Sequence, residues 1–505
     1  MSLPGCRFFP SSAALLLLAS CGLTSLGTAS ADEILIEEEP SGGDEIMIDD
    51  GSAGGGPLIE QGAAGSEGVL IDDGAPGQAA PQDTLIIGGD SAVSTAPAMP
   101  EATGGPRFAV DDVRLEYGQQ IRDASEADRE FYGKLAVSLE WQPRPEWEVR
   151  LAGRLDGYSQ DGRKDWSELR ADYGDSYVRY RGDGYRVTAG AQTVIWGRLD
   201  EIPLSDRVST VDLSRFLLDK LEDRRRATPM LRAETNLGPG KLDLVWLYSF
   251  RAAELPDQDS IWYPVNRTTG RILGVNRADI APAVIQAATI IEDEPNGNGG
   301  FGIRYTASPY FGDIGITVAK TRRSVPYFQV VGVGPPQLKT VYPRSWAFGA
   351  DTAVDAAGIT WRAEVVYSSD NPVTRRDGLY TYTTTPGIDW GFGAEMHPGD
   401  GDTRVNLQLV GSNLIDAPAV LDRTQAYNLN GEIETPFDHE RWRASFDFFV
   451  GLDKKDLFLN PEIAFLGWEP HELYLALNYF EGDEQTLGGF HQNHSSLNLG
   501  WRAKF

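Results

Sequence analysis

The sequence predicts an all-β fold, a closed transmembrane β-barrel of about 18 antiparallel strands, with about 16 as the alternative count. Three observations predict it. After residue 106, apolar and polar residues alternate at period two in many short segments, short turns alternate with longer loops between these segments, and the chain ends in such a segment. A strand with lipid on one face and water on the other requires this alternation.

The last segment, "HSSLNLGWRAKF", shows the alternation most clearly, with apolar side chains on one face and polar side chains on the other. The ending resembles the C-terminal insertion signal of outer-membrane proteins, whose positions are occupied here by Asn498, Gly500, Ala503 and Phe505. This resemblance implies insertion into outer-membrane lipid by the barrel assembly machinery. The alternative is an ordinary amphipathic edge strand, although its exposed apolar face would favour aggregation in water.

Hairpins recur upstream of this segment. The segments "RAETNL" and "KLDLVWLYSF", joined by a Gly-Pro-Gly turn, form the clearest one. Short periplasmic turns and longer external loops are typical of transmembrane barrels, and an even number of strands returns both ends to the periplasm. The alternative is a soluble β-sandwich or propeller, whose turns would look alike at both ends.

The first 31 residues are typical of a secretory signal peptide, with Arg7 before the apolar run "AALLLLASCGL". We expect cleavage after Ala31. The alternative is a lipoprotein-type cleavage at "LASC", which would leave Cys21 lipidated. Both cysteines, Cys6 and Cys21, lie in this region, so a chain cleaved after Ala31 has no structural disulfide. The sequence after residue 31 has no run of about 18 apolar residues, so it does not predict a transmembrane helix.

Residues 32–106 are predicted to be a disordered acidic tail, and residues 107–505 the barrel. The tail contains 16 acidic residues and no Lys or Arg, which contributes strongly to a net charge of −29 and argues against a nucleic-acid partner. Five short apolar-acidic motifs recur in the tail. Their apolar residues are Ile34, Leu35, Ile36, Ile46, Met47, Ile48, Leu58, Ile59, Val69, Leu70, Ile71, Leu85, Ile86 and Ile87.

Short β-prone motifs on a flexible segment suit strand addition to the sheet edge of a partner, and several copies raise the effective concentration. We therefore expect the tail, in the periplasm, to dock a periplasmic or inner-membrane transport component. The motif "DTLII" at Asp83 also resembles the box through which outer-membrane receptors engage the energising protein TonB, which implies a TonB-like partner and a barrel without a plug. The alternative is an acidic linker without a docking role.

If the apolar face of each strand meets lipid, the polar face lines an aqueous lumen. Arginine is somewhat more frequent than acid on that face, and rings of arginine select anionic groups in pores. The alternative is a lattice of inward ion pairs that stiffens the wall. The candidate pore-lining, anion-binding residues are Arg150, Arg154, Arg179, Arg181, Arg186, Arg232, Arg304, Arg362, Arg404 and Arg443.

The connection over residues 196–228 is long and rich in arginine, and its segment "TVDLSRFLLDKLED" predicts a short helix. Such a connection either folds into the lumen and narrows it, or forms a solvated external loop whose arginines are balanced by nearby acids. As a constriction loop it would contribute Arg198, Arg207, Asp212, Arg215, Arg224, Arg225 and Arg226.

The segment "GAQTVIWG", with Gly190, Gln192 and Trp196, leads into a loop containing Asp212 and then a Pro-Met-Leu segment at Pro229. This pattern resembles the outer-membrane porins related to alginate exporters. The resemblance implies an outer-membrane channel, and arginine contacts to an acidic polymer if that selectivity is shared.

No catalytic, metal or cofactor motif appears, so we expect no enzyme activity and no cofactor. His491, His494 and Ser495 lie close together in "HQNHSS", but we expect a polar loop there. The sequence therefore predicts an outer-membrane channel of a Gram-negative bacterium, for export or uptake of a polar or anionic solute or polymer. The alternatives are an outer-membrane adaptor that recruits periplasmic proteins, a TonB-engaged barrel, and a barrel hydrolase.

Overall fold

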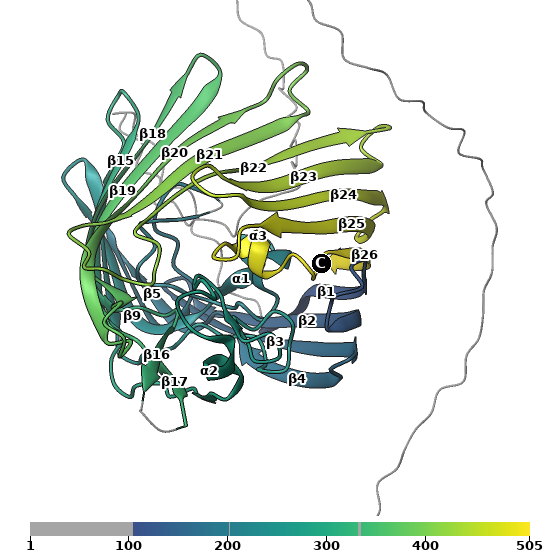
Figure 1. Cartoon of the computed structure of the whole chain (residues 1–505). Coiled ribbons are helices and arrows are strands. Elements are labelled where there is room, and N and C mark those ends of the chain that lie inside the picture. Colours follow the sequence, from purple (N-terminus) through teal and green to yellow (C-terminus); the bar gives the residue numbers. More distant parts are fainter. Residues whose placement is uncertain (1–104, 201, 332–334) are drawn as a thin grey trace, which may run out of the picture. The chain divides into compact units, whose positions relative to one another are not determined.

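A computed structural model describes residues 105–505, apart from residue 201 and residues 332–334. Within these residues one antiparallel sheet closes on itself, because its first strand pairs with both the second and the last strand (Figure 1). Closure removes the free edges of the first and last strands, which a sheet in lipid could not leave unpaired. The predicted signal peptide, the predicted tail up to residue 104 and its five motifs lie outside the described residues.

The wall of the barrel consists of long strands in chain order. They are β1 (Arg107–Gln120), β2 (Ala127–Arg144), β3 (Trp147–Gly162), β4 (Trp166–Tyr173), β5 (Ser176–Gly182), β6 (Tyr185–Gln192), β9 (Thr228–Leu237), β10 (Gly240–Leu247), β14 (Gly300–Ala307), β15 (Asp313–Arg322), β18 (Arg344–Ala356), β19 (Ile359–Thr374), β20 (Tyr382–Met396), β21 (Arg404–Leu414), β22 (Gln425–Phe437), β23 (Trp442–Gly451), β24 (Asp456–Trp468), β25 (His471–Gly482) and β26 (Ser496–Lys504).

Short elements lie in the connections between these strands. They are β7 (Thr210–Val211), η1 (Phe216–Leu218), α1 (Leu221–Arg224), β8 (Arg225–Arg226), β11 (Val265–Asn266), β12 (Arg271–Ile272), α2 (Pro282–Gln286), β13 (Thr289–Ile291), β16 (Tyr327–Val331), β17 (Gln337–Val341) and α3 (Leu487–Phe490). None of the helices in the described residues is long and apolar enough to cross a membrane.

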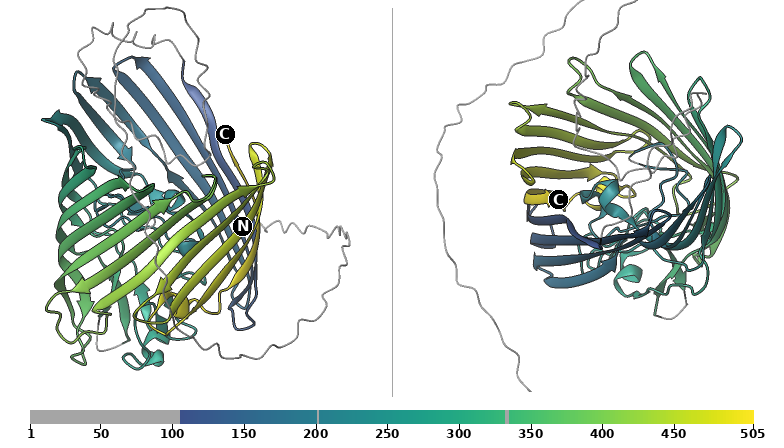
Figure 2. Two further views of the ribbon diagram at one scale, coloured as in Figure 1. Left: turned by 90° about the horizontal axis from the view of Figure 1, so that it is seen from above. Right: turned by 180° about the vertical axis from the view of Figure 1, so that it is seen from behind.

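The barrel has 18 strands, as the sequence predicts. The sheet contains 19 segments, but β4 and β5 pair one after the other along β3 and form one interrupted strand. Connections are short at the end of the barrel that holds Arg107 and Lys504, for example residues 145–146 and 183–184. They are long at the opposite end, where residues 193–227, 248–299 and 323–343 connect strands. This asymmetry confirms the predicted pattern of short turns and long loops; Figure 2 shows the oblique strands from two further sides.

The two faces of the wall differ as a transmembrane barrel requires. Large apolar side chains on the outer face are exposed, including Leu151, Phe348 and Leu499, whose residues are 56, 49 and 59 % exposed. Polar side chains on the inner face are buried, including Gln408 at 1 % and Glu364 at 3 %. In water such an outer surface would be unstable, whereas in lipid it is solvated.

One strand edge in this wall has no ladder partner. The N–H of Gly174, just after β4, donates to the carbonyl of Ala152 on β3 (2.8 Å). Backbone groups in an antiparallel strand face its two neighbours alternately, so the N–H and C=O groups of Leu169 and Ala171 face away from β3. No strand among the described residues pairs with that edge, since β6 ends at Gln192, opposite Thr228 of β9. Figure 1 shows β4 as the last strand of the series that runs from β22 through β26 and β1.

A small folded unit occupies the connection over residues 248–299. Its β13 pairs with β17 of the connection over residues 323–343, and β17 pairs with β16. Tyr263, Ile285 and Leu338 are each 1 % exposed and lie in one apolar cluster. We call this unit the cap. No periodic pattern in the sequence predicts this unit, although Trp262, Tyr263 and Ile285 lie in an interval between strands that is longer than the other connections.

Candidate functional site

The ten predicted wall arginines all project from the inner face of the barrel, and each forms an ion pair with a carboxylate. This arrangement agrees with the second of the two predictions for these arginines, a lattice of inward ion pairs, in which each arginine is neutralised by a nearby carboxylate. Their role in anion binding stays a prediction. The pairs are Arg150–Glu140, Arg154–Asp156, Arg179–Glu148, Arg181–Glu148, Arg186–Glu234, Arg232–Asp243, Arg304–Asp351, Arg362–Glu395, Arg404–Glu432 and Arg443–Glu472.

The connection over residues 193–227 lies inside the barrel, and we call it the inserted connection. Its helix α1 lies within the ring of strands in Figure 1. The connection begins at the end of β6, where the indole of Trp196 donates to Asp243 (3.0 Å) and is fully buried against the wall. Gly302 makes room for this ring, because a Cβ there would lie 2.6 Å from the indole. Val194 and Met230 pack in the same cluster.

A single carboxylate fixes the next part of the inserted connection. Glu364, on the inner face of β19, accepts hydrogen bonds from the backbone N–H groups of Arg198, Leu199 (2.8 Å) and Ser205 (3.0 Å). Leu199 packs on a patch of the wall made of small residues, where a Cβ on Gly391 would lie 2.3 Å from it. Backbone groups that leave the sheet thus regain hydrogen bonds inside the barrel.

The same part of the connection forms ion pairs with four strands. Arg198 pairs with Asp351 of β18 (2.8 Å) and with Asp313 of β15 (3.1 Å). Asp200 pairs with Arg362 of β19 (3.0 Å) and lies 3.7 Å from Arg404 of β21. Two arginines predicted to line the pore therefore hold the inserted connection in place.

The later part of the inserted connection reaches the opposite wall. Arg215 pairs with Glu116 of β1 and with Asp219 (3.2 Å). Lys220 hydrogen-bonds to Glu432 of β22, and Asp223 pairs with Lys134 of β2 (2.9 Å). The connection thus crosses the interior from the β18–β21 side to the β1–β2 side.

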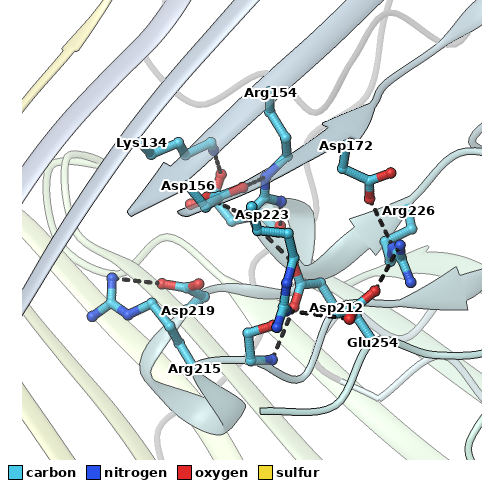
Figure 3. Close-up of polar contacts among 12 residues, drawn as sticks. Lys134, Arg154, Asp156, Asp172, Asp212, Arg215, Asp219, Asp223, Arg226 and Glu254 are labelled. Atoms are coloured by element: carbon cyan, nitrogen blue, oxygen red, sulfur yellow. Dashed lines mark hydrogen bonds and ion pairs between the residues drawn. The ribbon is translucent and has the colours of Figure 1, made fainter. Parts of the chain in front are cut away.

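The segments on either side of residues 215–223 are also held by ion pairs. Arg154 of β3 lies 3.4 Å from Asp212, and Arg226 pairs with Asp172 of β4 (2.9 Å) and with Glu254 of the cap (2.9 Å). Figure 3 shows these side chains together with Lys134, Arg215, Asp219 and Asp223.

The remaining predicted loop residues lie on the same path. Arg207 pairs with Asp389 of β20 (2.9 Å). The carbonyl of Arg224 accepts from the N–H of Asp212, and Arg225 belongs to β8, which pairs with β7.

The helix predicted over residues 210–223 does not form as one element. The structure has instead the two-residue strand β7, one 3₁₀ turn and one α-helical turn. Phe216 adopts a left-handed conformation with a φ of 52°, which a continuous helix excludes. Arg215, Lys220 and Asp223 have partners on several strands, and these long-range ion pairs override the local helix propensity.

The polar loop predicted around His491 and His494 forms between α3 and β26, but its two histidines are not solvated. Both side chains are buried, at 0 and 4 % exposure, and their Nδ1 atoms lie 3.0 Å apart. His491 packs against Phe216 of the inserted connection and Trp262 of the cap. Burial, with His494 adding to it, lowers the pKa of His491 well below its ordinary value. Burial, with Arg271 nearby, also lowers the pKa of His494 to about 3.

The four residues of the predicted insertion signal lie at the C-terminal end of the barrel. Asn498 donates to Glu116 inside the barrel (2.9 Å), and Gly500 leaves room for the ring of Tyr474. Ala503 is buried in β26, and Phe505 is 67 % exposed just beyond it. The described residues contain no group of three or more His, Cys, Asp or Glu side chains that could hold a metal ion.

An 18-strand barrel with an apolar outer face, a charged inner face and a connection folded across its interior defines a porin-like transmembrane β-barrel. A family model described as "Protein of unknown function (DUF1302)" matches residues 108–469. The chain belongs to this family.

Several solved structures are similar to this chain at low sequence identity. OccAB1 of Acinetobacter baumannii has a TM-score of 0.47 at 9 % identity and covers 81 % of this chain and 99 % of its own. OpdQ of Pseudomonas aeruginosa has a TM-score of 0.44 at 8 % identity, covering 80 and 99 %. OmpF of Salmonella typhi, in complex with daunomycin, has a TM-score of 0.41 at 8 % identity, covering 79 and 97 %. No curated protein matches the sequence.

Proposed function

We propose that this protein is an outer-membrane channel for a polar or anionic solute or polymer, which passes through the barrel without covalent chemistry. The observation that carries the proposal is the inserted connection, which lies across a closed barrel and is held by side-chain ion pairs on opposite walls. A segment in this position narrows the lumen and lines it with charge, as a selectivity element requires.

The contacts around the inserted connection suit passage of polar groups. They are mostly hydrogen bonds and ion pairs, as between Asp200 and Arg362, and the carboxylate or phosphate of a solute can compete for a guanidinium. The resemblance to porins related to alginate exporters supports an acidic polymer as one candidate cargo.

Planar-bilayer recording tests the channel. The purified full-length protein, folded in detergent, should give discrete current steps in a salt solution. Because a folded barrel migrates faster than its heated form on a denaturing gel, that shift checks the fold of each preparation. Folded protein that inserts into the bilayer and carries no current would rule out the channel.

We further propose that residues 32–106 face the periplasm and dock a transport component, either a periplasmic protein or a TonB-like inner-membrane protein, by strand addition. The support is the fivefold recurrence of short β-prone motifs. Deleting residues 32–106 should leave conductance unchanged and remove partners from a cross-linked pull-down. If the full-length protein carries no current but its tail still recovers partners in the pull-down, the protein would instead be an outer-membrane adaptor that recruits periplasmic proteins. Identical pull-downs with and without the tail would exclude docking.

A further inference from the structure

A small cavity at the long-loop end of the barrel is lined by three arginines and no acid. It measures about 10 Å³, and its lining includes Arg207, Arg251 and Arg322 together with Thr210 and Ser249. No Asp or Glu belongs to that lining. Arg207 and Arg251 each pair with a carboxylate outside the lining, whereas Arg322 has no ion pair among the contacts of the described residues.

Three polar atoms around this cavity are buried and lack a hydrogen-bond partner among the described residues. They are Nε of Arg207, Nε of Arg322 and the hydroxyl of Thr210, a residue that is 1 % exposed. Buried donors without an acceptor are unfavourable, and native proteins rarely leave them without a protein, water or ligand partner. Three such groups around one cavity indicate an acceptor-rich occupant.

The arginines are held in place by groups outside the cavity. Arg207 donates to Asp389 (2.9 Å), and Arg322 donates to the carbonyl of Tyr342 (3.1 Å). Arg251 donates to Asp172 of β4 and stacks over the ring of Tyr173 at 3.9 Å. Their orientation is therefore largely set before any ligand arrives, which reduces the entropy lost on binding.

Positive charge exceeds negative charge around these groups. Arg323, next to Arg322, donates to the amide oxygen of Asn371 and has no ion pair among the contacts of the described residues. Burial, followed by the neighbouring Arg207, lowers the pKa of Arg323 to about 10. Asp389 and Asp172 each already pair with an arginine of the cavity, so an additional anion would relieve the repulsion.

We infer that this cavity is an oxyanion site, which receives one oxygen of a carboxylate or phosphate group carried by the solute. A cavity of this volume holds one atom of about the size of water, and the guanidinium group favours carboxylate and phosphate oxygens. The site joins the inserted connection (Arg207, Thr210), the cap (Arg251) and the end of β15 (Arg322). This inference rests on the proposed channel, since it names the chemical group that the channel selects.

Titration of the full-length protein tests the site. Unfolding is followed by heat-dependent gel mobility while sodium phosphate or sodium acetate replaces sodium chloride at constant ionic strength. We expect saturable stabilisation by phosphate, acetate or both, and Arg322→Gln should weaken it roughly tenfold, because a charge-assisted hydrogen bond is lost. Thr210→Val, which removes only the unpartnered hydroxyl, should weaken it several-fold and serves if Arg322→Gln fails to fold.

Arg423→Gln is the matched control, because Arg423 pairs with Asp453 and is not among the residues that line the cavity. It should titrate as the unaltered protein does. Equal stabilisation by chloride and the oxyanions, or an unchanged titration in both cavity variants, would overturn the inference. If the protein conducts but is not stabilised by oxyanions, the inferred oxyanion site is wrong and the proposed channel stands. If it binds oxyanions saturably but does not conduct, the proposed channel is wrong and the oxyanion site stands.

Discussion

At the scale of single residues, the sequence pattern predicts the orientation of Glu364 but not its hydrogen-bond partners. The alternation along β19 predicts that Glu364 faces the lumen. It does not predict that this one carboxylate accepts hydrogen bonds from three backbone N–H groups of a segment more than a hundred residues away. Inward orientation follows from period two, whereas the identity of the partner depends on how the whole connection folds.

Glu364→Gln should loosen the inserted connection while leaving the barrel closed. The amide keeps the size of the side chain but loses the negative charge, so stability should fall by about 3 kcal/mol. The urea midpoint of the folded barrel measures this loss, and protease cleavage within residues 193–227 should accelerate. Glu140→Gln is the control, because that side chain is 56 % exposed and its one ion pair among the described residues is with Arg150. Similar losses in the two variants would contradict an anchoring role.

The buried histidines predict a specific acid sensitivity. Their pKa values in the folded protein lie below the ordinary 6.5. The unfolded chain therefore binds more protons below about pH 6.5, and stability falls as the pH drops from 6.5 toward 3. His491→Phe, which suits the surrounding aromatic rings, should reduce the loss of urea midpoint between pH 7.5 and 4.5. His439→Gln, at an exposed position, should leave this loss of urea midpoint unchanged. If His491→Phe also leaves it unchanged, the buried histidines do not cause the acid sensitivity.

At the scale of elements, strands were predictable from the sequence and connections were not. Each strand must alternate because lipid and lumen impose opposite polarity on its two faces. The inserted connection obeys no such period. Its predicted helix gives way to short turns because Arg215, Lys220 and Asp223 bind separate strands, and these partners lie far away in the sequence.

Gly391→Ala tests how the inserted connection seats on the wall. The new methyl group would lie 2.3 Å from Leu199, whose side chain is buried among small residues. Overpacking of this kind costs about 1–3 kcal/mol, and Leu199 should move away from the wall and change the single-channel conductance. Gly157→Ala, where the nearest atom of Leu169 is 3.8 Å away, should change neither quantity. Equal urea midpoints for the two variants would show that Leu199 does not pack there in solution.

At the scale of the whole molecule, the strand number and the closed ring agree with the sequence-based prediction, because 18 alternating segments leave few other solutions in lipid. The cap was missed for a physical reason. Its apolar cluster joins residues from Tyr263 to Leu421, so no local pattern reveals it. The inward ion-pair lattice was one of two alternatives that the sequence left open, and its individual pairs could not be assigned, because most of the carboxylates lie on another strand, as Asp351 and Glu472 do for Arg304 and Arg443.

The unpaired edge of β4 has a mechanical consequence for the barrel. A barrel in which every strand is hydrogen-bonded to both neighbours resists widening, because the force is shared by the hydrogen bonds around the whole circumference. Backbone hydrogen bonds join β4 to β3, but at Leu169 and Ala171 none of the described strands pairs with the opposite edge. On that side β4 is held by side chains such as Asp172, which pairs with Arg226 and Arg251. The amides of Leu169 and Ala171 should therefore exchange hydrogen for deuterium faster than that of Arg170, which faces β3. If the barrel widens under strain, it should open at β4 first.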